Sequence, residues 1–352
     1  YFELALHYCK NYDPASAGSD YGIPLVTEYA PSSDYSKYPG RSSLKETFDF
    51  IVKDLEQASN LVGIQGEAQS AYITLDVVEA LKARVYLEME DYQNAAAAAQ
   101  GLINSKRYTL ISDGDAYKKM WLNDVGTEAI WQFAMSKTET GSNALGSSFM
   151  GIVDKLPRPS YLPVKSVLNL YDKENDIRYD AYFTTGLIDR QVGDDIEVTY
   201  CSKWPGNPEL YEGKSNNVNK LKAFRISEMY LIAAEAYAML NQEDKASEML
   251  NELKKIRIKG WTETVYNGAA LMQEIQDERV RELFAEGNRL FDMKRWKIGM
   301  KRSSSDAQRD DYLPALGTDI EKEATDNRWV WPIPKDEMDS NPQLKGQQNP
   351  GY

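Results

Sequence analysis

Apolar side chains recur every three or four residues along much of this chain, which is the period of an amphipathic α-helix. The stretches with this spacing are residues 44–61, 75–89, 92–105, 226–240, 243–258 and 271–284. Ser43, followed three positions later by Glu46, forms a capping-box pattern that predicts where the first of them begins. Residues 1–12 have the same character and are predicted to end a further helix. The pattern therefore predicts a mainly α fold.

Four of these predicted helices form two pairs that share one arrangement of small and aromatic residues. The shared positions are Ala83, Tyr86, Ala95 and Leu102 in the first pair, and Ala234, Tyr237, Ala246 and Leu253 in the second. In both pairs a tight turn joins the helices, and alanine lets the two helices approach closely. The spacing and residue types match the tetratricopeptide helix pair, whose copies stack on one another. We therefore expect an α-α superhelix of tetratricopeptide-like pairs, interrupted between the two copies.

The region between the two pairs differs in composition. Residues 106–225 hold short apolar runs, Gly/Ser-rich and Pro-rich loops, and a stretch at 196–201 that predicts a β-strand. Binding function tends to concentrate in such loops. We therefore divide the chain into three parts. These are a helical part at 1–105, an irregular, loop-rich ligand-binding insertion with short strands at 106–225, and a part at 226–352 with the second pair, an ion-paired helix and an extended tail.

Charge and length restrict the class of protein. The chain has 352 residues and a net charge of −13, so it lacks the basic surface that binding to nucleic-acid phosphates requires. No segment approaches the roughly 18 apolar residues in a row that span a bilayer. The first residues have the pattern of the middle of a helix, so we expect the natural N-terminus to lie further upstream.

Histidine, cysteine and the known catalytic motifs offer little chemistry. His7 is the single histidine, and Cys9 and Cys201 lie far apart without metal-ligand spacing. We expect free, buried thiols, a packed or surface histidine, and neither a metal nor a cofactor. The sequence has no Gly-rich phosphate loop, nucleophile elbow or zinc-protease motif. The sequence therefore offers few candidates for catalysis, and recognition is the chemistry that remains.

The densest run of charge lies at residues 278–296, which we predict to be one helical segment. Its carboxylates have arginines within helical reach, so they should form an ion-pair lattice and stay ionised. Replacing Arg289 by Ala should then destabilise the fold by leaving buried carboxylates unpaired. A glycosidase is the enzymatic alternative, and it requires two facing carboxyl groups, at least one of them free of arginine.

Aromatic residues in loops suggest a recognition site. The chain has 23 tyrosines and seven tryptophans. Sugars offer flat apolar faces to aromatic rings and hydroxyl groups to polar side chains. Two loop clusters combine these residue types, one within residues 13–41 and the other within 138–163. The candidate ligand-binding residues are Tyr35 and Tyr38 in the first cluster, and Asn143, Phe149, Arg158 and Tyr161 in the second.

Several segments resemble one protein family, in the same order along the chain. They lie at residues 22–28 (GIPLVTE), 54–58 (DLEQA), 176–178 (DIR), 225–236 (RISEMYLIAAEA), 278–296 (ERVRELFAEGNRLFDMKRW) and 331–352, which contains WPIP, NP and QNPGY. These segments are similar to motifs of the SusD/RagB family of surface nutrient-binding lipoproteins. Met293 stands where that family usually has Leu.

The resemblance implies a helical fold of tetratricopeptide-like pairs without enzymatic activity, in which the motif residues are structural. It also implies a lipoprotein of the outer membrane, exposed at the cell surface, that captures a glycan and delivers it to a SusC-like TonB-dependent transporter. The family's lipidated cysteine belongs to an N-terminal region, so neither Cys9 nor Cys201 fills that role. Two alternatives stay open, a peptide-capturing member of the family and a tetratricopeptide scaffold that binds proteins.

Overall fold

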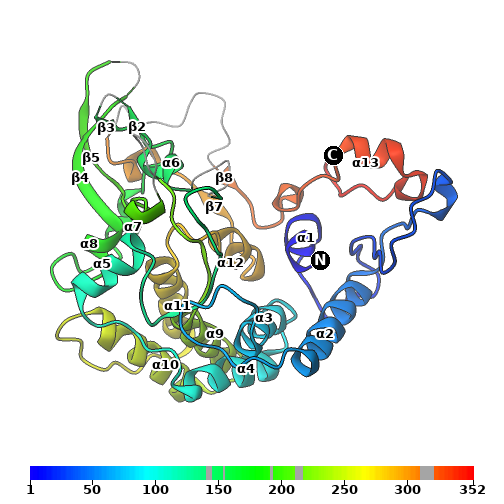
Figure 1. Cartoon of the computed structure of the whole chain (residues 1–352), viewed down its shortest axis with the longest axis horizontal. Coiled ribbons are helices and arrows are strands. Elements are labelled where there is room, and N and C mark those ends of the chain that lie inside the picture. The colour runs from blue at the N-terminus through cyan, green and yellow to red at the C-terminus, as the bar shows by residue number, and fades with distance from the viewer. Residues whose placement is uncertain (140–144, 154, 191–192, 211–216, 310–320) are drawn as a thin grey trace.

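The computed structural model describes residues 1–139, 145–153, 155–190, 193–210, 217–309 and 321–352, and helices dominate them, as the sequence predicts (Figure 1). The helices are α1 (Phe2–Tyr8), α2 (Leu44–Leu61), α3 (Leu75–Glu88), α4 (Tyr92–Ser105), α5 (Gly114–Leu122), α6 (Leu145–Met150), α7 (Lys165–Leu168), α8 (Tyr179–Tyr182), α9 (Ile226–Met239), α10 (Glu243–Arg257), α11 (Gly268–Glu282), α12 (Arg289–Arg295) and α13 (Lys335–Ser340). The strands are β1 (Ala129–Gln132), β2 (Ile152–Val153), β3 (Leu156–Pro157), β4 (Phe183–Ile188), β5 (Ile196–Cys201), β6 (Lys222–Arg225), β7 (Met300–Lys301) and β8 (Glu321–Lys322). No helix in these ranges is long and apolar enough to cross a membrane.

The two tetratricopeptide-like pairs form the centre of the molecule. The first pair is α3 and α4, the second is α9 and α10, and α4 packs directly against α9 although the whole inserted region separates them in sequence (Figure 1). The repeated alanines at these contacts are fully buried, namely Ala83, Ala95, Ala234 and Ala246. Glu90 and Asn241 form the tight turns with φ of 58° and 57°. The predicted pairing of helices is confirmed.

α2 begins and ends where the sequence predicts. The Ser43 hydroxyl accepts a hydrogen bond from the Glu46 amide at 3.1 Å, and the Glu46 carboxylate accepts from the Ser43 amide at 2.8 Å. This capping box satisfies donors that the first turn of a helix leaves free. The buried face of α2 packs Phe48 against Phe2 of α1 and Val85 of α3 in one apolar cluster. α1 and α2 are thereby fixed to the helix stack.

The inserted region leaves the stack and returns to it at one place. β1 and β6 pair antiparallel, so the two ends of this region lie side by side. Within the inserted region, aromatic side chains form a separate core, which contains Tyr117, Trp121, Tyr171, Tyr182, Phe183 and Trp204. β4 and β5 form a hairpin in which Ile188 faces Ile196. The strand predicted at 196–201 is therefore confirmed as β5.

The sequence predicts one helical segment over residues 278–296, and here the prediction is wrong. α11 ends and α12 begins within this stretch. Between them, Ala285 and Gly287 have φ of 58° and 87°. Gly287 reaches this left-handed region without steric cost, whereas Ala285 does so at some cost in strain.

Hydrogen bonds to the inserted region explain this break. The Lys203 ammonium donates to the Phe284 carbonyl at 2.7 Å, and the Trp204 indole N–H donates to the Ala285 carbonyl at 3.1 Å. In a continuous helix these carbonyls would accept from amides one turn further along. The break therefore exchanges helical hydrogen bonds for bonds between distant segments.

The loop at residues 13–41 and the C-terminal tail form an arm beside α1 (Figure 1). Arg41 joins them, because its guanidinium donates to the Gly22 carbonyl at 2.7 Å, the Gln347 carbonyl at 2.9 Å and the Asn349 side chain at 2.8 Å. The tail, which the sequence predicts to be extended, also contains the short helix α13.

Candidate functional site

The first predicted cluster lies on a single 3-10 turn of the arm. Tyr35 and Tyr38 meet edge to face with ring centroids 5.6 Å apart, and the Asp34 carboxylate caps the turn by accepting from the Ser36 amide at 3.0 Å. The Tyr38 hydroxyl donates to the Ser32 carbonyl at 3.0 Å, and this ring is half-buried. Tyr35 is 57% exposed. Tyr38 thus supports Tyr35, which presents an open aromatic face.

The second predicted cluster lies where α6 meets the β2–β3 hairpin. Phe149 and Tyr161 have ring centroids 6.3 Å apart, and Tyr161 is 66% exposed while Phe149 is half-buried against the aromatic core. The Arg158 guanidinium donates to the Asp189 carboxylate at 2.5 and 3.1 Å and remains partly exposed. Asn143, the remaining residue predicted for this cluster, lies outside the described residues.

The two clusters do not come together. The arm that carries Tyr35 and Tyr38 lies on one side of the molecule, and α6 with β2 and β3 lies on the other (Figure 1). The six residues predicted from the sequence therefore do not line one common site. Among those described, Phe149, Arg158 and Tyr161 form one group, and Tyr35 and Tyr38 form another.

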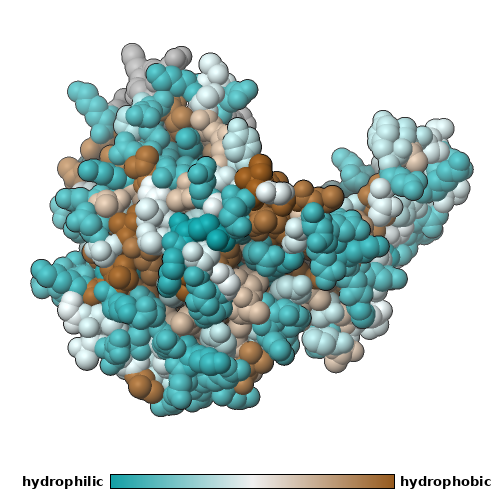
Figure 2. Space-filling model, turned by 60° about the horizontal axis from the view of Figure 1, so that its bottom comes forward, coloured by the Kyte–Doolittle hydropathy of each residue, from teal (hydrophilic) through white to brown (hydrophobic). Residues whose placement is uncertain are grey.

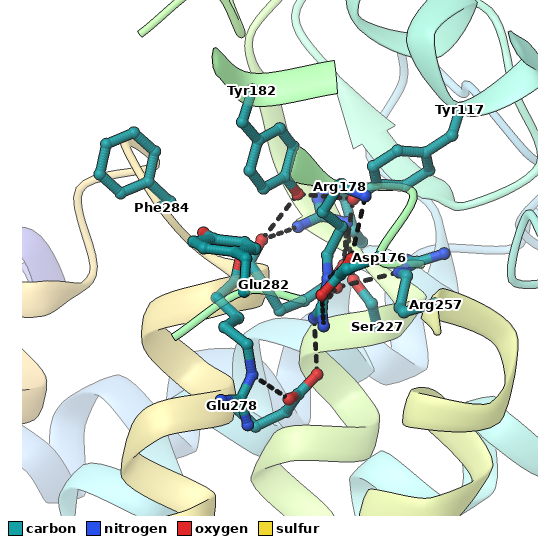
Figure 3. A network of polar contacts seen from close by, with 12 residues as sticks. Tyr117, Asp176, Arg178, Tyr182, Ser227, Arg257, Glu278, Glu282 and Phe284 are labelled. Atoms are coloured by element: carbon teal, nitrogen blue, oxygen red, sulfur yellow. Dashed lines mark hydrogen bonds and ion pairs between the residues drawn. The ribbon is translucent and has the colours of Figure 1, made fainter. Parts of the chain in front are cut away.

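A buried network of ions occupies the contact between the inserted region and the helices (Figure 3). The Glu282 carboxylate, at the end of α11, accepts from three guanidinium groups: Arg178 at 3.1 Å, Arg225 at 2.8 Å, and Arg257 at 2.9 and 3.0 Å. All four residues are 1% exposed or less. Charges that are buried so completely persist only when each is paired and hydrogen bonded.

Arg178 connects the inserted region to α11. Its guanidinium donates to the Asp176 carboxylate at 2.7 and 2.9 Å and to Glu278 at 2.6 Å (Figure 3). Burial, the largest influence on Glu278, disfavours its charged form, but the ion pairs with Arg178 and Arg281 outweigh burial and lower its pKa to about 2. Glu282 behaves in the same way, and its pKa lies well below the ordinary value. Both carboxylates are therefore ionised at neutral pH.

The predicted lattice is present, but most of its partners are not those that helical spacing indicates. The pair between Arg281 and Glu278, at 2.6 Å, is three residues apart along α11. Asp292 and Arg295, on α12, are also three residues apart. Arg178, Arg225 and Arg257 come from distant elements, as the sequence separation of 100 residues between Arg178 and Glu278 illustrates. Arg178 and Arg225 lie in the motifs at 176–178 and 225–236. These motifs carry the family resemblance, but they do not indicate which carboxylates the two arginines pair with.

The role predicted for Arg289 belongs to other arginines. Arg289 is exposed at the start of α12. The buried Asp292 carboxylate pairs instead with Arg279 at 2.7 Å and Arg295 at 2.9 Å. The prediction for Arg289 is therefore wrong, because the break before α12 turns its side chain out to solvent.

Two predictions about single residues are confirmed. Cys9 and Cys201 are buried and free, and burial raises the pKa of the Cys201 thiol to about 11. His7 is packed, with its ring 4.5 Å from Trp331 and 5.0 Å from Phe291, centroid to centroid. Within the described ranges, no three His, Cys, Asp or Glu side chains gather closely enough to hold a metal ion.

An apolar groove, which sequence reasoning missed, lies where α1, α2 and α3 meet β6 and α12. It has a volume of about 910 Å³. Aliphatic and aromatic side chains dominate its walls, among them Leu6, Ile51, Leu55, Val78, Leu81 and Phe291. Figure 2 shows apolar side chains gathered in the hollow between the body of the molecule and the arm. We call this feature the apolar groove.

Comparison with known proteins gives one consistent result. The model of the SusD family matches residues 184–352. SusD-like protein P38 of Formosa agariphila is 25% identical over 370 residues, which cover 92% of this chain and 69% of that protein. SusD-like protein P25 of the same organism is 22% identical and is covered over 59% of its length.

Solved structures agree in fold. A SusD superfamily protein from Bacteroides thetaiotaomicron superposes with a TM-score of 0.80 at 27% identity, covering 99% of this chain and 75% of that one. A structure from Bacteroides vulgatus, described as a putative sugar binding protein, has a TM-score of 0.77 at 24% identity and is covered over 74% of its length.

Proposed function

Because the chain belongs to the SusD family, we propose that it is a cell-surface protein that captures an oligosaccharide or polysaccharide. In this proposal it passes the glycan to a SusC-like TonB-dependent transporter in the outer membrane. Membrane attachment would come from a lipidated segment outside these 352 residues. The observation that carries the proposal is the exposed ring of Tyr161, beside the half-buried Phe149, in a member of this family.

The inserted region at 106–225 is the proposed ligand-binding part. Tyr161 offers an exposed ring, Phe149 supports it from the aromatic core, and Arg158 lies at the base of the same hairpin. An aromatic face of this kind packs on the apolar face of a sugar ring, and a guanidinium with remaining N–H groups donates to sugar hydroxyls. Tyr35 and Tyr38 are proposed as a second aromatic contact for the same ligand class.

We propose a binding protein rather than a glycosidase. A glycosidase needs two carboxyl groups that face the sugar, one of them protonated as the acid. The carboxylates of the ion network, including Glu278 and Glu282, are fully buried and held ionised by arginine. Their position and charge suit them to joining the inserted region to the helices.

Affinity electrophoresis against a panel of soluble polysaccharides tests the proposal. We expect retardation by one class of polysaccharide, and less retardation for Tyr161→Ala. Tyr72→Ala is the matched control, because Tyr72 is 77% exposed and belongs to neither cluster. Circular dichroism should show that both variants fold.

Two results would count against this reading. A chain that no polysaccharide retards would favour the peptide-capturing alternative. Sugar release from a retarded polysaccharide by the purified protein would refute the non-enzymatic role. Transfer to a transporter is tested separately, by asking whether the tagged protein, solubilised from its own membranes, co-purifies with a TonB-dependent transporter.

A further inference from the structure

The loop at residues 158–164, which carries Tyr161, is stiff and is held at its first end by α6. Pro159 and Pro163 lie on either side of Tyr161. Each proline has a fixed φ and restricts the residue before it, so the backbone of this loop has few conformations. The Ser160 amide donates to the Ser148 carbonyl of α6 at 2.9 Å. The position of Tyr161 then depends on what holds the second end of the loop, at Pro163.

The side chain of Gln308 holds that second end. Its Nε2 donates to the Pro163 carbonyl at 2.8 Å and to the Thr199 carbonyl at 2.7 Å, and its Oε1 accepts from the Thr199 amide at 2.8 Å. Towards β5 the side-chain amide therefore takes the place of one peptide group of a neighbouring strand. An amide group donates and accepts at the same time, so it can make all three hydrogen bonds.

The segment that presents Gln308 is itself fixed to the inserted region. Asp306, at the end of the 3-10 turn Ser304–Asp306, accepts from the Ser166 amide and from the Ser166 hydroxyl, both at 2.7 Å. Ser166 belongs to α7, which follows the loop directly. Gln308 thus reaches Pro163 from a segment that is anchored beside it, although 145 residues separate the two in sequence.

Two roles fit this geometry, and the third hydrogen bond distinguishes them. A side chain that only covers the exposed edge of β5 needs the two bonds to Thr199. The bond to Pro163 adds nothing to such a cap, but it ties β5 to the loop two residues beyond Tyr161. A loop that must be ordered when ligand binds reduces affinity, whereas a loop that is already held in place does not.

We propose that Gln308 is a positioning residue of the glycan site, which holds the loop at 158–164 against β5 so that Tyr161 is in place before ligand binds. The proposal rests on the proposed function, in which the Tyr161 ring contacts the glycan. Gln308 fixes where the loop lies, while the Tyr161 side chain, which is 66% exposed, can still turn to meet a sugar ring.

Hydrogen exchange of the backbone amides tests this role without any glycan. Gln308→Met keeps the length of the side chain and removes all three hydrogen bonds. We expect the amides of residues 160–162 to exchange about tenfold faster in this variant, because the loop opens locally more often. Gln273→Met is the matched control, since Gln273 is exposed on α11, and it should leave the loop unchanged. Faster exchange at Thr199 alone would overturn the proposal, because Gln308 would then only cap β5.

Glycan affinity tests the consequence. Gln308→Met should weaken binding of the retarding polysaccharide about threefold, since the loop must then be ordered on binding. The same substitution made in Tyr161→Ala should change affinity little, because the ring to be positioned is missing. An equal loss in both backgrounds would overturn the proposal. A wild-type chain that no polysaccharide retards would refute the proposed function instead, and the exchange experiment would still decide whether Gln308 holds the loop.

Discussion

Replacing Glu282 by Gln is the most direct test of the buried ion network. The substitution keeps the shape of the side chain and removes its charge. In the native protein Oε1 accepts from Arg225 and Arg257, while Oε2 accepts from Arg178 and Arg257. Whichever way the amide is oriented, its NH₂ group faces guanidinium donors in place of an acceptor. The variant therefore loses an ion pair and gains a repulsive contact.

The size of the effect follows from burial. Removing one partner of a buried ion pair costs about 3–5 kcal/mol, because the remaining charge stays buried without compensation. Each of the three arginines keeps another carboxylate, Glu128, Glu278 or Asp176 among them, which limits the loss. We expect the free energy of unfolding to fall by about 4 kcal/mol, a large part of the roughly 5–15 kcal/mol typical of a folded protein.

Urea unfolding followed by far-ultraviolet circular dichroism measures this change. Glu248→Gln on α10 is the matched control, since Glu248 is exposed and its substitution should alter stability by less than about 0.5 kcal/mol. A loss below about 1 kcal/mol for Glu282→Gln would refute the conclusion that burial makes this network strong, because an exposed ion pair contributes about as much to stability. It would mean that the network relaxes around the amide or admits water.

Three further predictions follow from the geometry. Arg295→Ala should lower the free energy of unfolding by about 3–5 kcal/mol, because it leaves buried carboxylates unpaired. Arg289→Ala should lower it by less than about 1 kcal/mol in the same urea titration, since Arg289 is exposed. Equal losses for the two variants would contradict the assignment of the buried ion pairs to Arg295. Burial, the largest influence, lowers the pKa of Lys203 from 10.5 to about 8. Between pH 8 and pH 10.5 the Lys203 side chain is therefore protonated in the unfolded chain and deprotonated in the folded protein. The free energy of unfolding should then rise with pH over this range. Measured against Lys203→Met at each pH, the wild-type protein should gain about 2 kcal/mol between pH 8 and about pH 10, and a flat difference would show that the ammonium is not desolvated. Tyr161→Ala should weaken glycan binding about three- to tenfold without loss of fold, as expected for one aromatic contact. Tyr72→Ala should bind the glycan as tightly as the wild-type protein does, with both affinities measured by isothermal titration calorimetry. Unchanged affinity for both variants would show that Tyr161 does not contact the glycan.

Local signals account for the part of the fold that the sequence predicts well. The start of α2 follows from the capping box at Ser43 and Glu46, and α4 is recognisable from its helical period, with Ala95, Ala96 and Ala99 buried. The two helix pairs are recognisable because alanine recurs wherever the helices touch. These features act over a few residues, so periodicity and spacing are sufficient to find them.

Features that depend on distant residues were not predictable in this way. The break after α11 exists because Lys203 and Trp204, from the inserted region, bind the carbonyls of Phe284 and Ala285. The hydrophobic periodicity of residues 278–296 does not predict these hydrogen-bond partners. Composition and loop chemistry identified aromatic clusters, but whether two loops converge depends on where the elements carry them. The apolar groove likewise forms only when α1, α2 and α3 meet, and no single segment shows it.

The ion network also limits how this molecule can move. Arg178 of the inserted region pairs with Glu278 and Glu282 at the end of α11, so a hinge that swung the inserted region away from the helices would break both of these buried ion pairs. That cost is of the same order as the stability of the whole fold. The inserted region and the helix stack should therefore behave as one rigid body. Adaptation to a ligand would fall to short loops such as the one that carries Tyr161, and not to domain closure.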